Sequence, residues 1–138
     1  MTGTGLRDAV GRLVHRPVAT IRPADTLREA ARTMTADGVG LLVVVDARGV
    51  HGVISERDVV RAAADELDLD EERVRDHATE ELVSVPDTAS VIEAAKRMSE
   101  AEVRHIAVSD RGEVTGIVSV RDAMTVLLDA LEVEATSD

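Results

Sequence analysis

The chain repeats itself at an offset of 64 residues. Without a gap, Val10–Arg61 aligns with Val74–Thr125, and 13 of the 52 aligned positions are identical. Self-similarity at a fixed offset predicts two copies of one supersecondary unit. The sequence therefore divides into a first repeat at 10–64, an acidic linker at 65–73 and a second repeat at 74–130, which together form one module.

Each repeat has the pattern strand, helix, strand, strand, helix. Apolar β-rich runs bounded by proline, glycine and aspartate predict the strands and a hairpin in each copy. The expected strands are Val18–Arg22, Leu41–Val45 and Val50–Ile54 in the first repeat and Leu82–Val85, Ile106–Ser109 and Val114–Val118 in the second. The continuous apolar run Leu41–Val45 indicates a strand covered on both faces.

A capping box is expected at the start of the first helix of each repeat. Thr26 is followed three residues later by Glu29, and Ser90 by Glu93. In such a pair the hydroxyl accepts from the N–H of the glutamate, and the carboxylate accepts from the N–H of the capping residue. Both helices are thus predicted to begin directly after the hydroxyl residue.

The composition excludes several functions. The chain has no cysteine, so disulfides, thiolate catalysis and cysteine-ligated metals are excluded. It has no aromatic residue on which nucleic-acid bases could stack, and its net charge of −11 repels nucleic acids and anionic membranes. No apolar run is long enough for a membrane span, and the N-terminus has no apolar signal segment. These features favour a cytoplasmic protein with no nucleic-acid or membrane partner.

The second helix of each repeat begins where a strand ends, in a repeated Gly-x-x-Ser-x-Arg-Asp motif. Its polar members are Ser55, Arg57 and Asp58 in the first repeat and Ser119, Arg121 and Asp122 in the second. A helix start offers N–H groups and a positive dipole end to a phosphate, to which the serine and arginine add donors. The aspartate is an acceptor for ribose hydroxyls. Serine and aspartate at this spacing also form a capping box with no ligand, and the two roles are compatible.

Metal binding and catalysis have weaker signals. The histidines His15, His51, His77 and His105 lack the spacing of a zinc site. The acidic run from Asp65 to Glu72 lacks the turn glycine and distal glutamate of an EF-hand, so we interpret it as a solvated linker rather than a calcium loop. No base is positioned by sequence to activate either serine. We therefore expect no metal, no required cofactor and no enzymatic activity.

The order and duplication of these motifs resemble a tandem pair of cystathionine β-synthase (CBS) domains, also called a Bateman module. The resemblance covers about residues 10–130 and includes the segment Val103–Asp110. It implies an α+β fold in which two β-α-β-β-α repeats pack through their sheets. It also implies two clefts between the repeats that bind adenosine compounds, namely AMP, ADP, ATP or S-adenosylmethionine.

The resemblance assigns roles to individual positions. It places Asp58 and Asp122 at the ribose, and Ser55 and Ser119 at the phosphate. Thr20, Ile21, Ile54, Ser84, Val85 and Val118 correspond to the positions that hold adenine.

The two copies differ around the expected phosphate position. The second repeat has Arg104 and His105 where the first has Gly40 and Leu41. The first also carries Glu56 where the second has Val120. An acidic group disfavours phosphate and basic groups favour it, so one dominant nucleotide is expected per chain, at the second junction.

The sequence thus predicts a regulatory module that senses an adenine nucleotide. A ligand-free interaction or scaffold protein is the alternative, and a small enzyme using the cleft is a weaker one. The apolar residues of the helix Val120–Leu131, with Val59 and Val60, further predict a homodimer. The sequence identifies neither the nucleotide nor a regulated partner protein.

Overall fold

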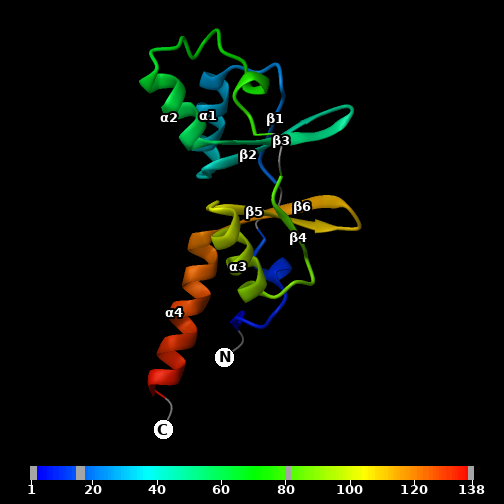
Figure 1. Ribbon diagram of the computed structural model, residues 1–138, viewed down its shortest axis with the longest axis vertical. Coiled ribbons are helices and arrows are strands. Elements are labelled where there is room, and N and C mark those ends of the chain that lie inside the picture. Colours follow the sequence, from blue (N-terminus) through cyan, green and yellow to red (C-terminus); the bar gives the residue numbers. More distant parts are fainter. Residues whose placement is uncertain (1–2, 15–17, 80–81, 137–138) are drawn as a thin grey trace. The chain divides into compact units, whose positions relative to one another are not determined.

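The computed structural model describes residues 3–14, 18–79 and 82–136, so that His15 lies outside the described residues. Two compact units are present, and each consists of one three-stranded sheet with two α-helices (Figure 1). The predicted β-α-β-β-α pattern is confirmed in both. No helix among the described residues is long and apolar enough to cross a membrane.

The first unit comprises residues 18–82. Its elements are β1 (Thr20–Ile21), α1 (Leu27–Asp37), β2 (Leu41–Asp46), β3 (Gly49–Ser55), α2 (Glu56–Ala64) and the short 3-10 helix η2 (Val74–Asp76). In the sheet, β1 runs parallel to β2, and β2 pairs antiparallel with β3 as the predicted hairpin. The middle of β2 is buried on both faces, as its apolar run predicts.

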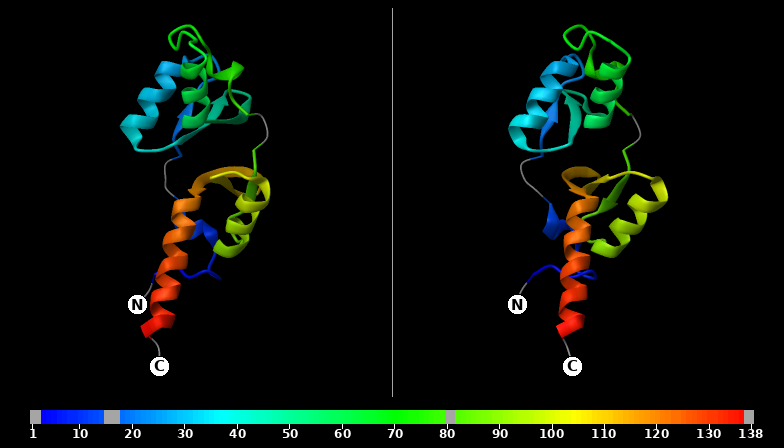
Figure 2. Two further views of the ribbon diagram at one scale, coloured as in Figure 1. Left: turned by 60° about the vertical axis from the view of Figure 1, so that its left-hand side comes forward. Right: turned by 90° about the vertical axis from the view of Figure 1, so that its left-hand side faces the viewer.

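The other unit combines residues 3–14 with residues 83–136. It contains η1 (Val10–Leu13), β4 (Ser84–Pro86), α3 (Val91–Ala101), β5 (His105–Asp110), β6 (Glu113–Ser119) and α4 (Val120–Thr136). Its sheet has the same order, with β4 parallel to β5 and β5 antiparallel to β6. In both views of Figure 2 the blue N-terminal segment lies beside α4, which is drawn in orange and red.

Equivalent residues of the two repeats form two separate cores. In the first unit the fully buried side chains include Leu27, Ala30, Leu42 and Ile54, and in the other unit they include Val91, Ala94 and Val118. These residues line the inner sides of the helices and the sheet face that the helices cover, as the predicted helical and strand periodicities require.

The boundaries of the compact units differ from those of the sequence repeats, because the opening segment of each repeat packs in the unit of the other repeat. Val10 and Val74 open the two repeats, and each is fully buried in the core of the unit formed by the rest of the other repeat. The N–H groups of Val91 and Ile92, at the start of α3, donate to the carbonyls of Asp8 and Leu6. The N-terminal segment therefore completes the helix start of the second repeat.

The acidic segment at 65–73 likewise accepts hydrogen bonds from the first N–H groups of α1. The N–H groups of Leu27 and Arg28 donate to the carbonyls of Glu72 and Leu69, each at 3.0 Å. The Arg28 side chain also pairs with the carboxylate of Asp70. The segment that the sequence presents as a solvated linker is thus bound to the first turn of a helix.

The two predicted capping boxes differ in the structure. Thr26 and Glu29 exchange both bonds, at 3.1 and 3.2 Å. Ser90 accepts from the N–H of Glu93 at 3.1 Å, and the reciprocal bond is absent from this pair. Both helices nevertheless begin at the predicted position, because one accepted bond suffices to define the N-cap.

Candidate functional site

Ser55 and Asp58 form a complete capping box at the start of α2. The N–H and the hydroxyl of Ser55 donate to Asp58 Oδ2 at 2.8 and 3.0 Å, and the N–H of Asp58 donates to Ser55 Oγ at 3.3 Å. The two side chains are half-buried. The capping role that the spacing predicts is therefore confirmed at the first junction.

The second junction repeats this geometry at the start of α4. Ser119 donates from its N–H and hydroxyl to Asp122 Oδ2 at 2.9 and 3.0 Å, and receives the N–H of Asp122 at 3.2 Å. In both junctions the serine donates both bonds to Oδ2 of the aspartate, so each aspartate is held in one orientation at the start of its helix.

The residue directly before each hairpin accepts a further bond from the helix start. The Glu56 N–H donates to the Gly40 carbonyl at 3.0 Å, and the Val120 N–H donates to the Arg104 carbonyl at 2.7 Å. Two of the first three N–H groups of each helix are thus engaged within the protein. Of these three donors, the N–H group at the second position remains for a phosphate. Arg57 and Arg121 occupy that position.

The residues predicted to hold adenine divide into two groups. The side chains of Ile21, Ile54, Val85 and Val118 belong to the two hydrophobic cores and are at most 9% exposed. The side chains of Thr20 and Ser84 are exposed. Of the residues predicted to hold adenine, the aliphatic ones are therefore part of the hydrophobic cores, and the two with hydroxyl groups are exposed to solvent.

The structure brings His105 to the second junction. In the hairpin register His105 lies opposite Ser119, while Leu41 takes the equivalent place opposite Ser55. Arg104 and Arg121 are exposed beside them, and Arg57 is exposed in the first repeat. The second junction therefore has His105 opposite its serine and Arg104 directly before that strand, where the first junction has Leu41 and Gly40.

Glu56 distinguishes the first junction further. A Cβ atom built on Gly40 would lie 3.0 Å from Glu56 Oε1 and 3.2 Å from Glu56 Cδ. The Glu56 carboxylate thus lies against Gly40. The equivalent of Gly40 in the second repeat is Arg104. A carboxylate in this place disfavours an anion nearby, and the difference in anion affinity between the two junctions stays a prediction.

Asp122 also borders an open groove of about 400 Å³ within its own unit. The groove lies between the N-terminal segment and α4. It is lined by Thr4, Arg12, Leu13, Val14, Asp122, Thr125, Val126 and Asp129. Sequence reasoning did not identify the lining residues 12–14, because the stagger of the two units brings them to α4 from more than 100 positions away in sequence.

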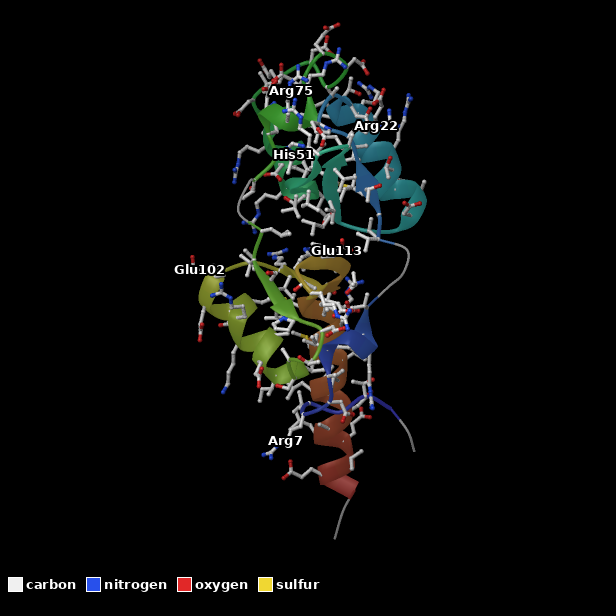
Figure 3. The ribbon with its side chains drawn as sticks, turned by 90° about the vertical axis from the view of Figure 1, so that its right-hand side faces the viewer. Arg7, Arg22, His51, Arg75, Glu102 and Glu113 are labelled. Carbon is white, nitrogen blue, oxygen red and sulfur yellow. The ribbon has the colours of Figure 1, made fainter. Side chains whose placement is uncertain are left out.

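Two ion pairs of the first unit join residues outside the Ser–Asp junctions. His51 Nε2 lies 2.7 Å from Asp46 Oδ1 across the hairpin, where Figure 3 labels His51. This hydrogen bond, together with the Arg48 N–H, lowers the pKa of the Asp46 carboxyl. The bond to Asp70 raises the pKa of Arg28. Among the described residues no group of three or more histidines or carboxylates could hold a metal ion.

Comparisons with known proteins agree with this organisation. The family model described as "CBS domain" matches twice, over residues 10–65 and 74–129. An uncharacterised 17.7 kDa protein of Acidianus ambivalens is 34% identical over 122 residues, which cover 87% of this chain and 73% of that protein.

Two solved structures are similar along almost the whole chain. A CBS-domain protein of Pyrobaculum aerophilum, complexed with AMP, is 32% identical with a TM-score of 0.79, and the match covers 90% of this chain and 98% of that one. A CBS-domain-containing protein of Agrobacterium tumefaciens is 29% identical with a TM-score of 0.80, and the match covers 92% and 98%.

Proposed function

Since the chain belongs to the CBS-domain family and carries two such domains in tandem, we propose that it is a regulatory module that binds an adenine nucleotide without catalysis. The observation that carries the proposal is the duplicated Ser–Asp junction, in a chain 32% identical to a CBS-domain protein complexed with AMP. The candidate ligands are AMP, ADP, ATP and S-adenosylmethionine.

The junction geometry suits a ribose-phosphate. In each capping box the aspartate is already oriented by two bonds to Oδ2, so that accepting a ribose hydroxyl costs little side-chain entropy. Arg121 and Arg104 are exposed near Ser119 and can contact a phosphate with charge-assisted bonds. We assign the ribose to Asp122 and the phosphate to Ser119, Arg121 and His105, with the first junction as a weaker second site.

Binding would regulate by shifting the geometry of an assembly. A ligand changes an equilibrium only through a difference in its affinity for the two states. We propose that the assembly is a homodimer that uses the exposed apolar residues of α4, and that a regulated partner protein responds to it.

One observation favours the alternative of a ligand-free scaffold. Both capping boxes are complete without any ligand, so the Ser–Asp motif already has a structural use. In that case duplication would have copied a cap rather than a binding site.

A thermal-stability screen separates the two functions. A ligand that binds only the folded state at 100 times its Kd adds about 2.7 kcal/mol of stability. We expect AMP, ADP, ATP or S-adenosylmethionine to raise the Tm measured by scanning calorimetry, a readout that needs no tryptophan or tyrosine.

The matched control is the double variant D58N/D122N, which keeps an amide oxygen for each cap and removes both charges. The proposal predicts a Tm increase in the natural chain and none in this variant. An unchanged Tm for the natural chain with every ligand would contradict nucleotide binding and support the scaffold.

A further inference from the structure

The N-terminal segment, residues 3–14, is held in its unit by backbone hydrogen bonds. Val10 and Gly11 donate their N–H groups to carbonyls of the loop before α3, at 2.7 and 3.0 Å. In return, carbonyls of the segment accept from the first two N–H groups of α3, those of Val91 and Ile92, each at 3.0 Å. Val10 is the one fully buried residue of the segment. Four backbone bonds among the described residues and a single fully buried side chain therefore fix this stretch of chain.

The equivalent segment of the second repeat, residues 67–78, has additional attachments in the first unit. It makes the matching backbone bonds to α1 and to the loop before that helix. Its side chains add to these bonds, because Asp70 pairs with Arg28 and the Arg73 guanidinium donates to a carbonyl of the loop at 3.0 Å. This segment is also continuous in sequence with its unit, whereas the whole first unit lies in sequence between the N-terminal segment and the rest of its own unit. The N-terminal segment should therefore be released more easily.

The Asp8 carboxylate forms its bonds within the N-terminal segment. It accepts from the N–H of Gly5 at 2.8 Å and lies 3.4 Å from the guanidinium of Arg12. Both bonds can persist when the segment leaves its unit, so they do not fasten it there. Release of the segment breaks four backbone bonds and exposes Val10, which is a smaller change than unfolding of the core around β5.

The same segment forms one wall of the groove beside Asp122, next to α4 (Figure 2). Half of the lining residues belong to the segment, namely Thr4, Arg12, Leu13 and Val14, and the other half belong to α4. The groove therefore exists only while the segment is docked. Val14 also covers Gly116, three residues before Ser119, so that release of the segment would uncover the strand that leads into the second junction.

We propose that the N-terminal segment is a strap that opens as one piece while the rest of its unit stays folded, and that its docking controls ligand binding at the second junction. A ligand that contacts Asp122 and fills the groove binds the docked state and favours docking by its difference in affinity for the two states. The control of binding rests on the proposed function, whereas the opening of the strap is independent of it.

Hydrogen exchange measured by NMR without ligand tests the opening. The amides of Val10, Gly11, Val91 and Ile92 lose their bonds together when the segment leaves, so they should share one opening constant. This constant should exceed that of the β5 amides at least about tenfold. The first two amides of α1, which make the equivalent bonds in the first unit, should open less often than these four. Opening constants of the four amides equal to those of β5 would overturn the strap.

A reversible disulfide provides the matched control, because the chain has no cysteine of its own. A Cβ atom built on Gly11 lies 3.2 Å from the Cβ atom of Asp87, close to the separation of about 3.5–4.5 Å in a disulfide. In the oxidised double variant G11C/D87C the segment cannot leave, so the Val10 and Val91 amides should exchange at least about tenfold more slowly than in the reduced form. Equal exchange in the two forms of this protein would contradict release of the segment.

Exchange of the natural chain with AMP, ADP, ATP or S-adenosylmethionine tests the control of binding. At 100 times its Kd, a ligand that binds only the docked state slows exchange through the open state about 100-fold. We expect this factor at the Val10 and Gly11 amides. A ligand that raises the Tm and slows β5 but leaves the Val10 amide unchanged would overturn the control of binding. A chain that binds none of the four would refute the proposed function together with this control, while exchange without ligand decides the opening by itself.

Discussion

The side chain of Val14 lies directly over Gly116. A Cβ atom at position 116 would come within 1.8 Å of Val14 Cγ1 and 2.9 Å of Val14 Cβ. Gly116 belongs to β6, three residues before Ser119, whereas Val14 ends the N-terminal segment. The absence of a side chain in the repeated Gly-x-x-Ser motif is therefore what allows the N-terminal segment to close against the sheet.

G116A should destabilise the unit that contains residues 83–136. The added methyl group overpacks the contact, and overpacking of this kind costs about 1–3 kcal/mol. Chemical denaturation followed by circular dichroism measures the change. The double variant V14A/G116A removes the contact at 1.8 Å and keeps the one at 2.9 Å to the Cβ of residue 14, so it should recover part of the loss. A G116A protein as stable as the natural chain would refute the contact.

Val10→Ala tests the stagger of the two units. Val10 is fully buried with the core of the second repeat, so its truncation should cost roughly 1–2 kcal/mol in that unit. Hydrogen exchange should show lost protection in β5 and α3. The matched variant Val74→Ala should loosen α1 and β2 instead. Loss of protection in the first unit upon Val10→Ala would contradict the assignment of the segment.

Helices α1 and α3 both end in a left-handed residue, which is a glycine in α1 and a glutamate in α3. Glu102 and Gly38 occupy equivalent C-cap positions with φ of 56° and 65°, and Figure 3 labels Glu102. Left-handed φ is costly for a residue with a side chain and free of strain for glycine. E102G should raise the free energy of unfolding by about 0.5–1 kcal/mol, although glycine also loosens the unfolded chain.

The converse substitution controls for this effect. No atom lies within 4 Å of a Cβ built on Gly38, so G38A tests the φ preference without a clash. It should lower stability by about 1 kcal/mol in the same denaturation experiment. Stabilisation by G38A, or a loss with E102G, would show that φ is not the controlling term.

The Asp46–His51 pair predicts a change at acidic pH. The pKa of Asp46 is lowered from 3.8 in the folded chain, chiefly by the His51 hydrogen bond. A carboxyl with a lowered folded pKa contributes stability above its unfolded pKa and loses it as pH falls through the folded value. An NMR titration should therefore place the Asp46 midpoint below 3.8, and His51→Ala should move it up. An unchanged midpoint in His51→Ala would exclude the pair as the cause.

The local features of this fold could be predicted from the sequence. Hydroxyl–acid pairs such as Thr26/Glu29 and Ser119/Asp122 act within one helical turn, so their spacing fixes the helix starts. The hairpins followed from apolar runs around short turns. The absence of the bond from the Ser90 N–H to the Glu93 carboxylate could not be predicted, because side-chain rotamers depend on neighbours outside the motif.

The long-range features could not be predicted in this way. The places of Val10 and Val74 in the two cores depend on which unit each opening segment packs against, and periodicity carries no such information. For the same reason the sequence did not predict that Arg12 and Val14 lie in one groove with Asp122. The difference between the junctions was visible in Glu56 and Arg104, because a charge difference at equivalent positions appears directly in the alignment of the repeats.

In the proposed function a nucleotide binds at the second junction through Asp122. Calorimetric titration with AMP, ADP, ATP and S-adenosylmethionine tests it on the natural chain and on the matched variants D58N and D122N, which retain a capping oxygen. Loss of a charge-assisted bond costs about 1.5–3 kcal/mol, so D122N should weaken binding roughly 10- to 100-fold. D58N should retain most of the affinity, with about one nucleotide bound per chain. Equal losses in the two variants, a larger loss in D58N, or no binding to the natural chain would contradict the claim.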